Sequence, residues 1–330
     1  MQMTKHELAH PHDLLTRSIL VDPELAASLL TNYVESGIIE LLDLKRLRCE
    51  SPVDVDKNLV EIIGDLRYST VFKNTGQQSN VFVFLEHQST RDDLMSFRAL
   101  KQVVNAFQQY IDTAEQKGGQ PTSLPFPIVV ILYHGKRPWG KLKRMRDMID
   151  NVSAFAGDVL DFPIFLIDLS RIPPEQLKVH PALQALLELL QLASEGKLET
   201  GFDRVTSRLS AVRNDPRAPG WMKAFVRYTI SLCRIGQDII YKSFLKILDE
   251  KEARKMATST MQELILEGEV RGKLQDRKET ILDLLVARFG KAPKTIRDTV
   301  NSYSDLTALK SRSVLAGTCD SLNEFAEGLR

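Results

Sequence analysis

Two acidic residues, Asp65 and Glu86, stand at the outer ends of two apolar segments that flank a polar loop at residues 73–80. The β-branched and aromatic residues on both sides of this loop predict a β-hairpin. With the turn in the middle of the loop, antiparallel pairing sets Asp65 opposite Glu86 or Gln88. Two converging carboxylates repel each other unless a divalent cation neutralises them, so the pattern predicts a site for Mg²⁺, with Mn²⁺ as the alternative ion.

The segment that ends in Glu86 is typical of a buried central strand, because residues 81–85 are apolar on both faces. Side chains alternate along a strand, so Glu86 and Gln88 should project to one face and His87 to the other. A carboxylate at the end of such a strand is costly unless something pairs with it. The alternative interpretation is that the acids are solvated rim residues or salt-bridge partners of a residue such as Arg67.

Other short motifs accompany the paired acids in a fixed order. They are His12-Asp13-Leu14-Leu15, Asp65-Leu66, Glu86-His87-Gln88-Ser89-Thr90, and Tyr133-His134-Gly135 followed by Pro138-Trp139. In their order and spacing they resemble the Rpn, or YhgA-like, branch of the PD-(D/E)XK nucleases, which are recombination-promoting nucleases often labelled transposases. The resemblance covers most of the first half of the chain and, more loosely, the helical remainder. It implies an αβββαβ core with a mixed central sheet.

The resemblance also implies roles for individual residues. Asp65 and Glu86 would hold Mg²⁺, helped by the backbone carbonyl of His87, and Gln88 would complete the catalytic set. Gly64 stands where the signature has Pro, and Gln88 replaces its Lys. A Lys supplies positive charge near the attacking water and the phosphate, whereas Gln88 can position them only by hydrogen bonding.

A basic segment follows the predicted strand at residues 127–133. Its six cations are Lys136, Arg137, Lys141, Lys143, Arg144 and Arg146. Such a cluster would contact DNA phosphates with a marked dependence on salt, and Trp139 adds an aromatic face that could pack or stack. The alternative is a solvated basic helix.

The order of predicted elements is that of an α/β protein with a mixed sheet. A helix should start at Asp22, with Pro23 in its first turn, and a short strand should span residues 46–53. After the hairpin, Thr90-x-x-Asp93 predicts the N-terminus of a helix. Its core stripe is predicted at Phe97, Leu100, Val104, Phe107 and Ile111. Two buried strands are then predicted, at residues 127–133 and 162–169.

The character of the sequence changes near residue 175, after which the pattern is helical throughout. We therefore predict a nuclease-like domain at residues 1–175 and a helical domain at residues 176–330, through which the chain could form a homodimer. Gly196, Gly236 and Gly290 are predicted helix C-caps. The segment at residues 268–278, with two glycines, is interpreted as a helix junction or an exposed hinge.

Composition bounds these hypotheses without selecting one. The 330 residues are 43% hydrophobic, which supports a large core, and the net charge is only +1, so any DNA surface must be a local patch. The three cysteines lack CxxC spacing, which indicates neither a zinc site nor a disulfide framework. The start of the chain lacks the features of a signal peptide, and no apolar run reaches about 20 residues. We expect a soluble cytoplasmic protein with no membrane partner.

Three histidines near the start, His6, His10 and His12, do not form a convincing metal site. Pro11 breaks their helical spacing, and no carboxylate pattern accompanies them. His12-Asp13 is therefore interpreted as an N-terminal docking element.

The sequence best fits a metal-dependent DNA endonuclease associated with DNA recombination or mobile elements. A catalytically silent DNA-binding or assembly protein of a mobile element, which keeps the nuclease fold, is the alternative that Gln88 favours. A third hypothesis is an unrelated α/β protein in which the acids form ion pairs.

Overall fold

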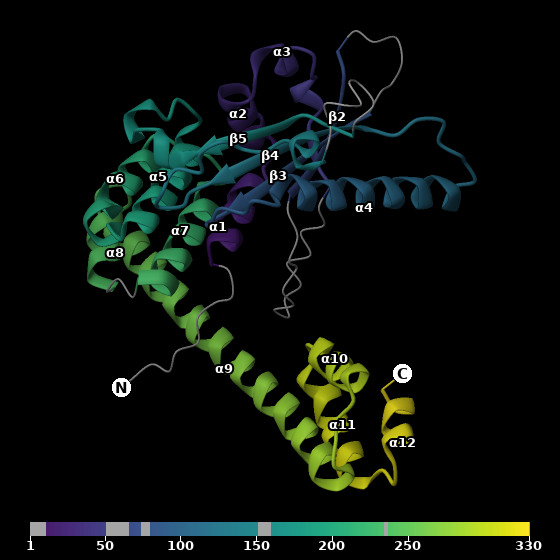
Figure 1. Cartoon of the computed structure of the whole chain (residues 1–330). Coiled ribbons are helices and arrows are strands. Elements are labelled where there is room, and N and C mark those ends of the chain that lie inside the picture. Colours follow the sequence, from purple (N-terminus) through teal and green to yellow (C-terminus); the bar gives the residue numbers. More distant parts are fainter. Residues whose placement is uncertain (1–10, 51–65, 74–79, 151–159, 234–236, 330) are drawn as a thin grey trace. The chain divides into compact units, whose positions relative to one another are not determined.

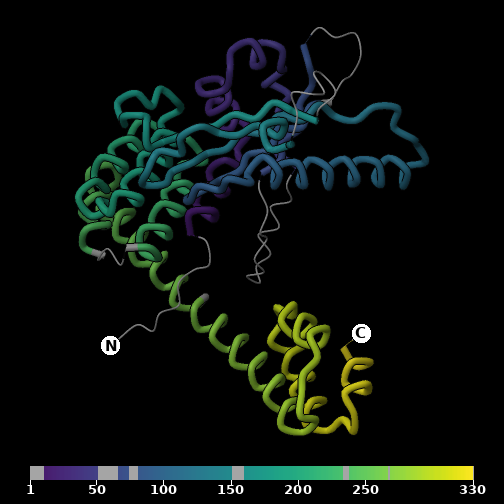
Figure 2. Tube along the Cα trace, viewed as in Figure 1, coloured from purple at the N-terminus to yellow at the C-terminus, as the bar shows by residue number. Residues whose placement is uncertain are grey.

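The computed structural model of the chain describes residues 11–50, 66–73, 80–150, 160–233 and 237–329 (Figures 1 and 2). By packing, the described residues up to 257 form a larger unit, and residues 258–329 form a smaller one. This division falls near residue 257, whereas the domains predicted from the sequence, 1–175 and 176–330, meet near residue 175. The helices that directly follow residue 175 pack within the larger unit.

The larger unit is built on a five-stranded sheet in which the strands lie in sequence order. The strands are β1 (Arg48–Cys49), β2 (Leu66–Val71), β3 (Asn80–Gln88), β4 (Phe126–Tyr133) and β5 (Ile164–Asp168). Antiparallel pairing joins β1 to β2 and β2 to β3, and parallel pairing joins β3 to β4 and β4 to β5. The prediction of an α/β fold with a mixed sheet is confirmed.

The hairpin that carries the predicted site is present. Its register sets Leu66 opposite Leu85 and Val71 opposite Asn80. The side chains of residues 81–85 are all buried, as expected for a strand with neighbours on both sides. The turn itself, at residues 74–79, lies outside the described residues.

Helix α4 (Met95–Gln116) connects β3 to β4 and runs along the sheet (Figure 1). Its buried positions include Ala99, Val103 and Ala106, which pack in one cluster with Phe82 and Phe84 of β3. The predicted stripe is therefore wrong in part, because Phe97 and Val104 are 46% and 54% exposed. Leu100 and Phe107, which belong to the same prediction, do pack against this cluster. The small side chains at Ala99 and Ala106 bring a neighbouring face of the helix close to the sheet.

The N-terminus of α4 also differs from the prediction. The helix starts at Met95, four residues after Arg91, and its N-cap residue, Leu94, has no side-chain cap. Asp93, the acid of the predicted Thr90-x-x-Asp93 signal, instead accepts two hydrogen bonds from Arg91 at 2.9 and 2.7 Å. Asp92 accepts from the Leu94 N–H at 2.8 Å. Local side-chain partners thus replace the predicted cap.

Further helices complete the larger unit. They are α1 (Pro11–Leu20), α2 (Pro23–Tyr33), α3 (Ser36–Ile39), α5 (Pro181–Glu195), α6 (Leu198–Ser210), α7 (Ala218–Cys233) and α8 (Gln237–Phe244). Helix α1 contacts α5 and α7. The Tyr68 hydroxyl of β2 donates to the Leu20 carbonyl, which ties α1 to the sheet face opposite α4. Pro23 lies in the first turn of α2 and Gly196 caps α5 in the left-handed conformation, as predicted.

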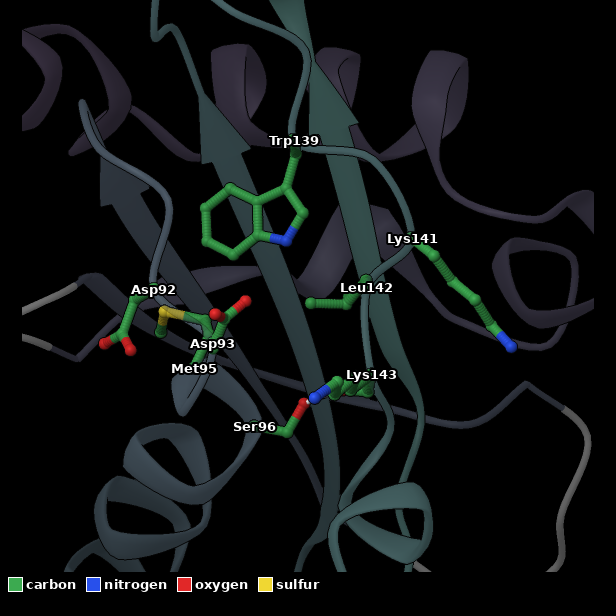
Figure 3. A pocket seen from close by; sticks show the side chains of 8 residues that line it. All are labelled: Asp92, Asp93, Met95, Ser96, Trp139, Lys141, Leu142 and Lys143. Atoms are coloured by element: carbon green, nitrogen blue, oxygen red, sulfur yellow. Dashed lines mark hydrogen bonds between the residues drawn. The ribbon is translucent and has the colours of Figure 1, made fainter.

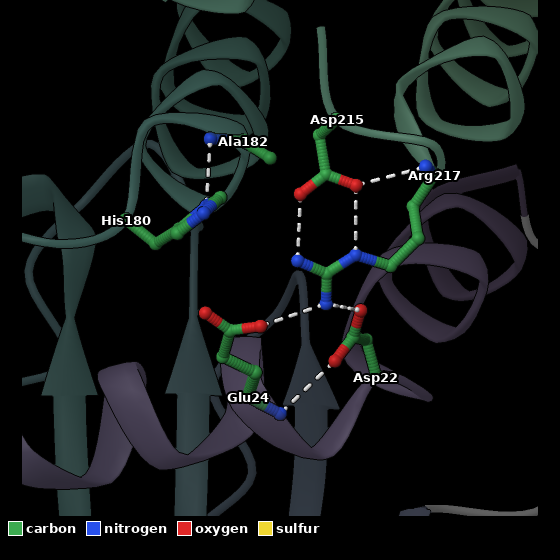
Figure 4. Close-up of polar contacts among 6 residues, drawn as sticks. All are labelled: Asp22, Glu24, His180, Ala182, Asp215 and Arg217. Atoms are coloured by element: carbon green, nitrogen blue, oxygen red, sulfur yellow. Dashed lines mark hydrogen bonds and ion pairs between the residues drawn. The ribbon is translucent and has the colours of Figure 1, made fainter. Parts of the chain in front are cut away.

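One arginine ties α2 to the start of α7 (Figure 4). Arg217 donates through Nη1 to Asp22 at 2.7 Å and to Glu24 at 2.8 Å. Through Nε and Nη2 it also holds both carboxylate oxygens of Asp215. The guanidinium lies 5.0 Å from the centre of the Trp221 ring. The contact joins segments that are far apart in sequence, and Arg217 lowers the pKa of Asp215 to about 2 by its hydrogen bonds.

The smaller unit is helical and has its own core. Helix α9 (Glu250–Phe289) continues into it, followed by α10 (Lys294–Ser302), α11 (Leu306–Thr318) and α12 (Leu322–Glu327). Ile281, Leu285 and Leu309 are fully buried in this core. The interpretation of residues 268–278 as a junction or hinge is wrong, because they lie inside α9. Across the described part of the chain, no helix is both long enough and apolar enough to cross a membrane.

Candidate active site

The end of β3 carries the described part of the predicted site. Glu86 is fully buried at 0% exposure, and Gln88 is partly buried. The Gln88 Nε2 donates a hydrogen bond to Oε2 of Glu86 at 3.3 Å. Both side chains continue the face of β3 that carries Phe82 and Phe84, so they lie on the α4 side of the sheet. The structure therefore brings these two predicted site residues together.

Asp65, the other predicted acid, lies outside the described residues. The hairpin register is described as far as Leu66, which faces Leu85. One pairing predicted from the sequence sets Asp65 opposite Glu86, which is the next pair in the same antiparallel register. The pairing of the two acids stays a prediction.

The backbone at His87 has a defined direction. The Gln88 carbonyl accepts from the His134 N–H at 3.1 Å and therefore points toward β4. Successive carbonyls of a strand point to alternate sides, so the His87 carbonyl points toward the β2 side. This is the side on which the sequence places the acid at position 65. The direction of the carbonyl thus suits its predicted role as a metal ligand.

The His87 ring lies on the opposite face, where it is clamped by residues distant in sequence. Its Nδ1 is 2.6 Å from Oδ1 of Asp13 in α1. Its ring stacks on that of His134, with centroids 4.6 Å apart and planes inclined by 5°. His12, in turn, lies 2.7 Å from the Tyr228 hydroxyl of α7 through its Nδ1. The docking role predicted for His12-Asp13 is confirmed.

Burial keeps two of these histidines neutral. Desolvation, with His87 and His12 nearby, lowers the pKa of His134 to about 2. Desolvation and His87 lower the pKa of His12 to about 4, although Asp13 opposes this change. The rings of His12 and His134 thus act as a structural support behind the end of β3.

The donor chemistry at the end of β3 fits a hard cation. Mg²⁺ prefers oxygen ligands and is commonly held by one or two carboxylates plus waters. Glu86 and the His87 carbonyl offer such oxygens, and a fully buried carboxylate is stabilised by a nearby positive charge. Among the residues that the structure describes, no group of three or more His, Cys, Asp or Glu side chains could hold a metal ion. Mg²⁺ and its ligands therefore stay a prediction.

The basic segment forms an ordered loop and a short 3₁₀ helix, Met145–Met148, not a basic α-helix. Trp139 is 2% exposed, and its backbone N–H donates to Asp168 at 2.9 Å. Its ring therefore packs in the core and cannot stack on a base. The Tyr133 hydroxyl donates to the Arg137 carbonyl at 2.7 Å. These contacts fix the loop beside the end of β3, because β3 and β4 are parallel.

One cation near this loop was absent from the sequence prediction. Arg91 follows Gln88 by three residues, and its Nη1 lies 3.9 Å from the position that a Cβ would take at Gly140. The available signal was its position directly after the predicted site. A sequence alone gives no distance between Arg91 and the loop, so the contact could not be predicted.

A sequence model of the family described as "Putative transposase, YhgA-like" matches residues 10–218, which is more than half of the chain. The chain is 30% identical over 192 residues to recombination-promoting nuclease RpnD of Escherichia coli O157:H7, a match that covers 57% of this chain and 70% of that protein. It is 29% identical over 191 residues to recombination-promoting nuclease RpnA of Escherichia coli strain K12, covering 57% of this chain and 62% of that protein.

A further relative carries a different description. The chain is 24% identical over 209 residues to the inactive recombination-promoting nuclease-like protein RpnE of Escherichia coli strain K12, covering 63% of this chain and 67% of that protein. The matches thus span about two thirds of the length of these relatives. No solved structure matches the chain.

Proposed function

The chain belongs to the YhgA-like family, and from this premise we propose that it is a metal-dependent DNA endonuclease that hydrolyses phosphodiester bonds in DNA recombination or in mobile elements. Relatives named recombination-promoting nucleases support the kind of reaction. The mixed sheet, with Glu86 at the end of its central strand, supports a PD-(D/E)XK-type core.

One observation carries the proposal. Glu86 is a fully buried carboxylate at the C-terminal end of β3, where it is hydrogen-bonded by Gln88. Burial of a carboxylate costs folding free energy, and in a family of nucleases a buried carboxylate can serve as a metal ligand. Asp65, Glu86 and the His87 carbonyl would hold Mg²⁺. When bound, this ion lowers the pKa of a water and stabilises charge that develops on the phosphate.

The protein's own groups would do the remaining work. Gln88 holds Glu86 with one amide N–H, and its amide retains a second N–H and a carbonyl oxygen. With these groups it would orient the attacking water or a phosphate oxygen. The Asp13 and His134 contacts to the His87 ring would keep the strand end, and therefore the His87 carbonyl, in one orientation.

A plasmid-nicking assay tests the proposal. The unaltered protein should nick supercoiled DNA with Mg²⁺ or Mn²⁺ and lose this activity in EDTA. Asp65→Ala and Glu86→Gln should each slow nicking by about a hundredfold or more, because a metal ligand supports several kcal/mol of transition-state stabilisation. Glu199→Gln, a change at an exposed acid, is the matched control and should nick normally. Equal nicking by Glu86→Gln and the unaltered protein would contradict the proposed site.

The second candidate function is a catalytically silent DNA-binding or assembly protein. Gln88 in place of Lys favours it, and one relative of the chain is named an inactive nuclease-like protein. DNA binding by the unaltered protein without any nicking, over a range of Mg²⁺ and Mn²⁺ concentrations, would select this function. Family membership sets aside the third hypothesis, an unrelated α/β protein.

A further inference from the structure

A basic groove lies between the segment before α4 and the loop after β4. It encloses about 530 Å³, and its cationic lining residues are Arg91, Lys141, Lys143 and Arg146. Asp147 is the one carboxylate among its lining residues, so positive charge prevails. Figure 3 shows the narrow cleft beside it, which is lined by Lys141 and Lys143 from the loop and by Asp92 and Asp93 from the segment before α4.

The loop that carries the lysines is held by buried contacts on both sides of the groove. Trp139, buried in the α4 cluster, donates its N–H to Asp168 at the end of β5. The Lys143 carbonyl accepts from the buried hydroxyl of Ser96 in α4. Gly140 turns the chain between these anchors with a φ of +87°, a conformation that favours glycine. The positions of Lys141 and Lys143 are therefore set in advance of binding.

Three of the four cations of the groove are available to a ligand. Within the described part of the chain, Lys141, Lys143 and Arg146 are exposed and form no ion pair. Asp93 is already paired with Arg91, whereas Asp147, among the residues described, accepts only a backbone N–H, that of Arg144 at 3.1 Å, and keeps its negative charge. Lys141, Lys143 and Arg146 together outweigh the single negative charge of Asp147, so the groove keeps an excess of positive charge.

Arg91 is fixed from the other side. Asp93 holds its Nε and Nη2, and Nη1 points toward the loop near Gly140. The guanidinium thus has a set orientation with one N–H edge directed at the groove, which suits a phosphate oxygen.

The groove lies on the same face and at the same end of the sheet as the candidate site. Glu86 and Gln88 project from β3 on the α4 side, and Arg91 follows β3 directly. The loop begins where β4 ends, and the parallel register sets Gln88 beside Tyr133, the last residue of β4. A DNA strand with one phosphate at Glu86 would therefore place its neighbouring phosphates along the cations of the groove.

We propose that the basic groove binds successive backbone phosphates of the DNA strand that is cut, with Arg91 as its fixed contact and Lys141, Lys143 and Arg146 as the others. The identification of the ligand as DNA rests on the proposed function, whereas the ability of the groove to bind anions rests on its own residues. Of the six cations predicted to contact DNA, Lys141, Lys143 and Arg146 line the groove. The other three, Lys136, Arg137 and Arg144, do not line the groove.

Binding of a fluorescent DNA duplex, measured by anisotropy in EDTA over a series of salt concentrations, separates this proposal from catalysis. The triple variant Lys141→Ala, Lys143→Ala, Arg146→Ala should bind about tenfold or more weakly at 0.1 M salt. Its plot of log affinity against log salt should be shallower by about 3, near one unit per lost phosphate contact. Arg91→Ala should lower the slope by about 1.

The matched control removes the same number of exposed cations elsewhere. Lys101→Ala, Lys178→Ala, Arg213→Ala, changed together, should leave affinity and slope nearly unaltered. Equal losses in both triple variants, or no DNA binding by the unaltered protein, would overturn the proposal. If the groove variant loses binding while Glu86→Gln binds normally but does not nick, the groove and the catalytic site are both supported. If Glu86→Gln nicks normally while the groove variant loses binding, only the proposed catalytic site fails.

Discussion

At the level of single residues, Glu86 combines a buried position with an ionisable side chain. Its carboxylate is fully buried, and desolvation disfavours the charged form. The Gln88 amide donates to it but supplies no net charge. A Lys at position 88 would bring positive charge to this carboxylate, whereas Gln88 does not, so under the proposed function the divalent ion has the larger part in stabilising it. For this reason we expect activity to depend steeply on the concentration of the divalent ion.

The histidine cluster behind this site predicts a pH dependence of stability. The ordinary histidine pKa of 6.5 falls to about 2 for His134 and to about 4 for His12. Below pH 6.5 the unfolded chain therefore binds protons that the folded protein does not. The free energy of unfolding should fall as the pH is lowered from 7 to 5, a range above the titration of ordinary carboxylates. Urea unfolding at a series of pH values measures this.

The control for this prediction is the His134→Asn variant, which removes one of the two neutral histidines. Its stability should depend less on pH over the same range. The groups that face the cluster, Asp13, His87 and Tyr228, remain in place in this variant. Equal pH dependence in both proteins would contradict the assignment of the effect to His134.

The sequence could predict the local half of the site but not its partners. Alternation along a strand is enough to place Glu86 and Gln88 on one face and His87 on the other. Asp13 meets His87 across 74 positions and Tyr228 meets His12 across 216 positions. Such contacts depend on how α1 and α7 pack, and no local pattern encodes this.

At the level of elements, strands were predicted more accurately than the faces of helices. The sequences of β3, β4 and β5 are short continuous apolar runs, a pattern that indicates a buried strand. In α4, two neighbouring stripes both satisfy the helical period. The stripe with Ala99 and Ala106 faces the sheet because small side chains permit a closer approach, which leaves Phe97 and Val104 exposed.

The Arg217 contact predicts how α2 and α7 are held together (Figure 4). Arg217→Met should lower the Tm by roughly 2–4 °C, because one guanidinium binds three carboxylates and also lies over Trp221. The decrease should shrink in 1 M salt, since the network is partly exposed and is screened. Differential scanning calorimetry at low and high salt measures both effects.

Arg213→Met is the matched control for this prediction. Arg213 lies four residues earlier, is exposed, and forms no ion pair with any residue that the structure describes. Its replacement should leave the Tm nearly unchanged. An equal decrease in both variants would show that general charge, not this contact, stabilises the segment.

At the level of the whole molecule, the two units bury separate cores. The α4 cluster lies within the larger unit, and the cluster around Leu285 lies within residues 258–329. The change near residue 175 was predicted from the loss of strand patterns, and no strand is described after Asp168. Composition could not show that α5 to α8 belong to the same unit as the sheet, because an amphipathic helix does not specify its partner.

Separate cores predict separate unfolding transitions, which the two tryptophans allow to be distinguished. Trp139 and Trp221 are the only tryptophans of the chain and both belong to the larger unit, so their fluorescence reports on that unit alone. Far-ultraviolet circular dichroism reports on the helices of both units. Urea unfolding followed by the two signals should give curves that do not coincide, because one cooperative transition requires one shared core.

Two buried leucines provide the decisive comparison. Leu285→Ala should destabilise the smaller unit by roughly 2–5 kcal/mol, the usual cost of such a cavity, and leave the fluorescence transition unchanged. Leu186→Ala, at an equally buried position of the larger unit, should shift the fluorescence transition by a similar amount. If Leu285→Ala moved both signals together, the chain would unfold as one cooperative body. Selective loss of the smaller unit would instead show that its helices fold on a core of their own.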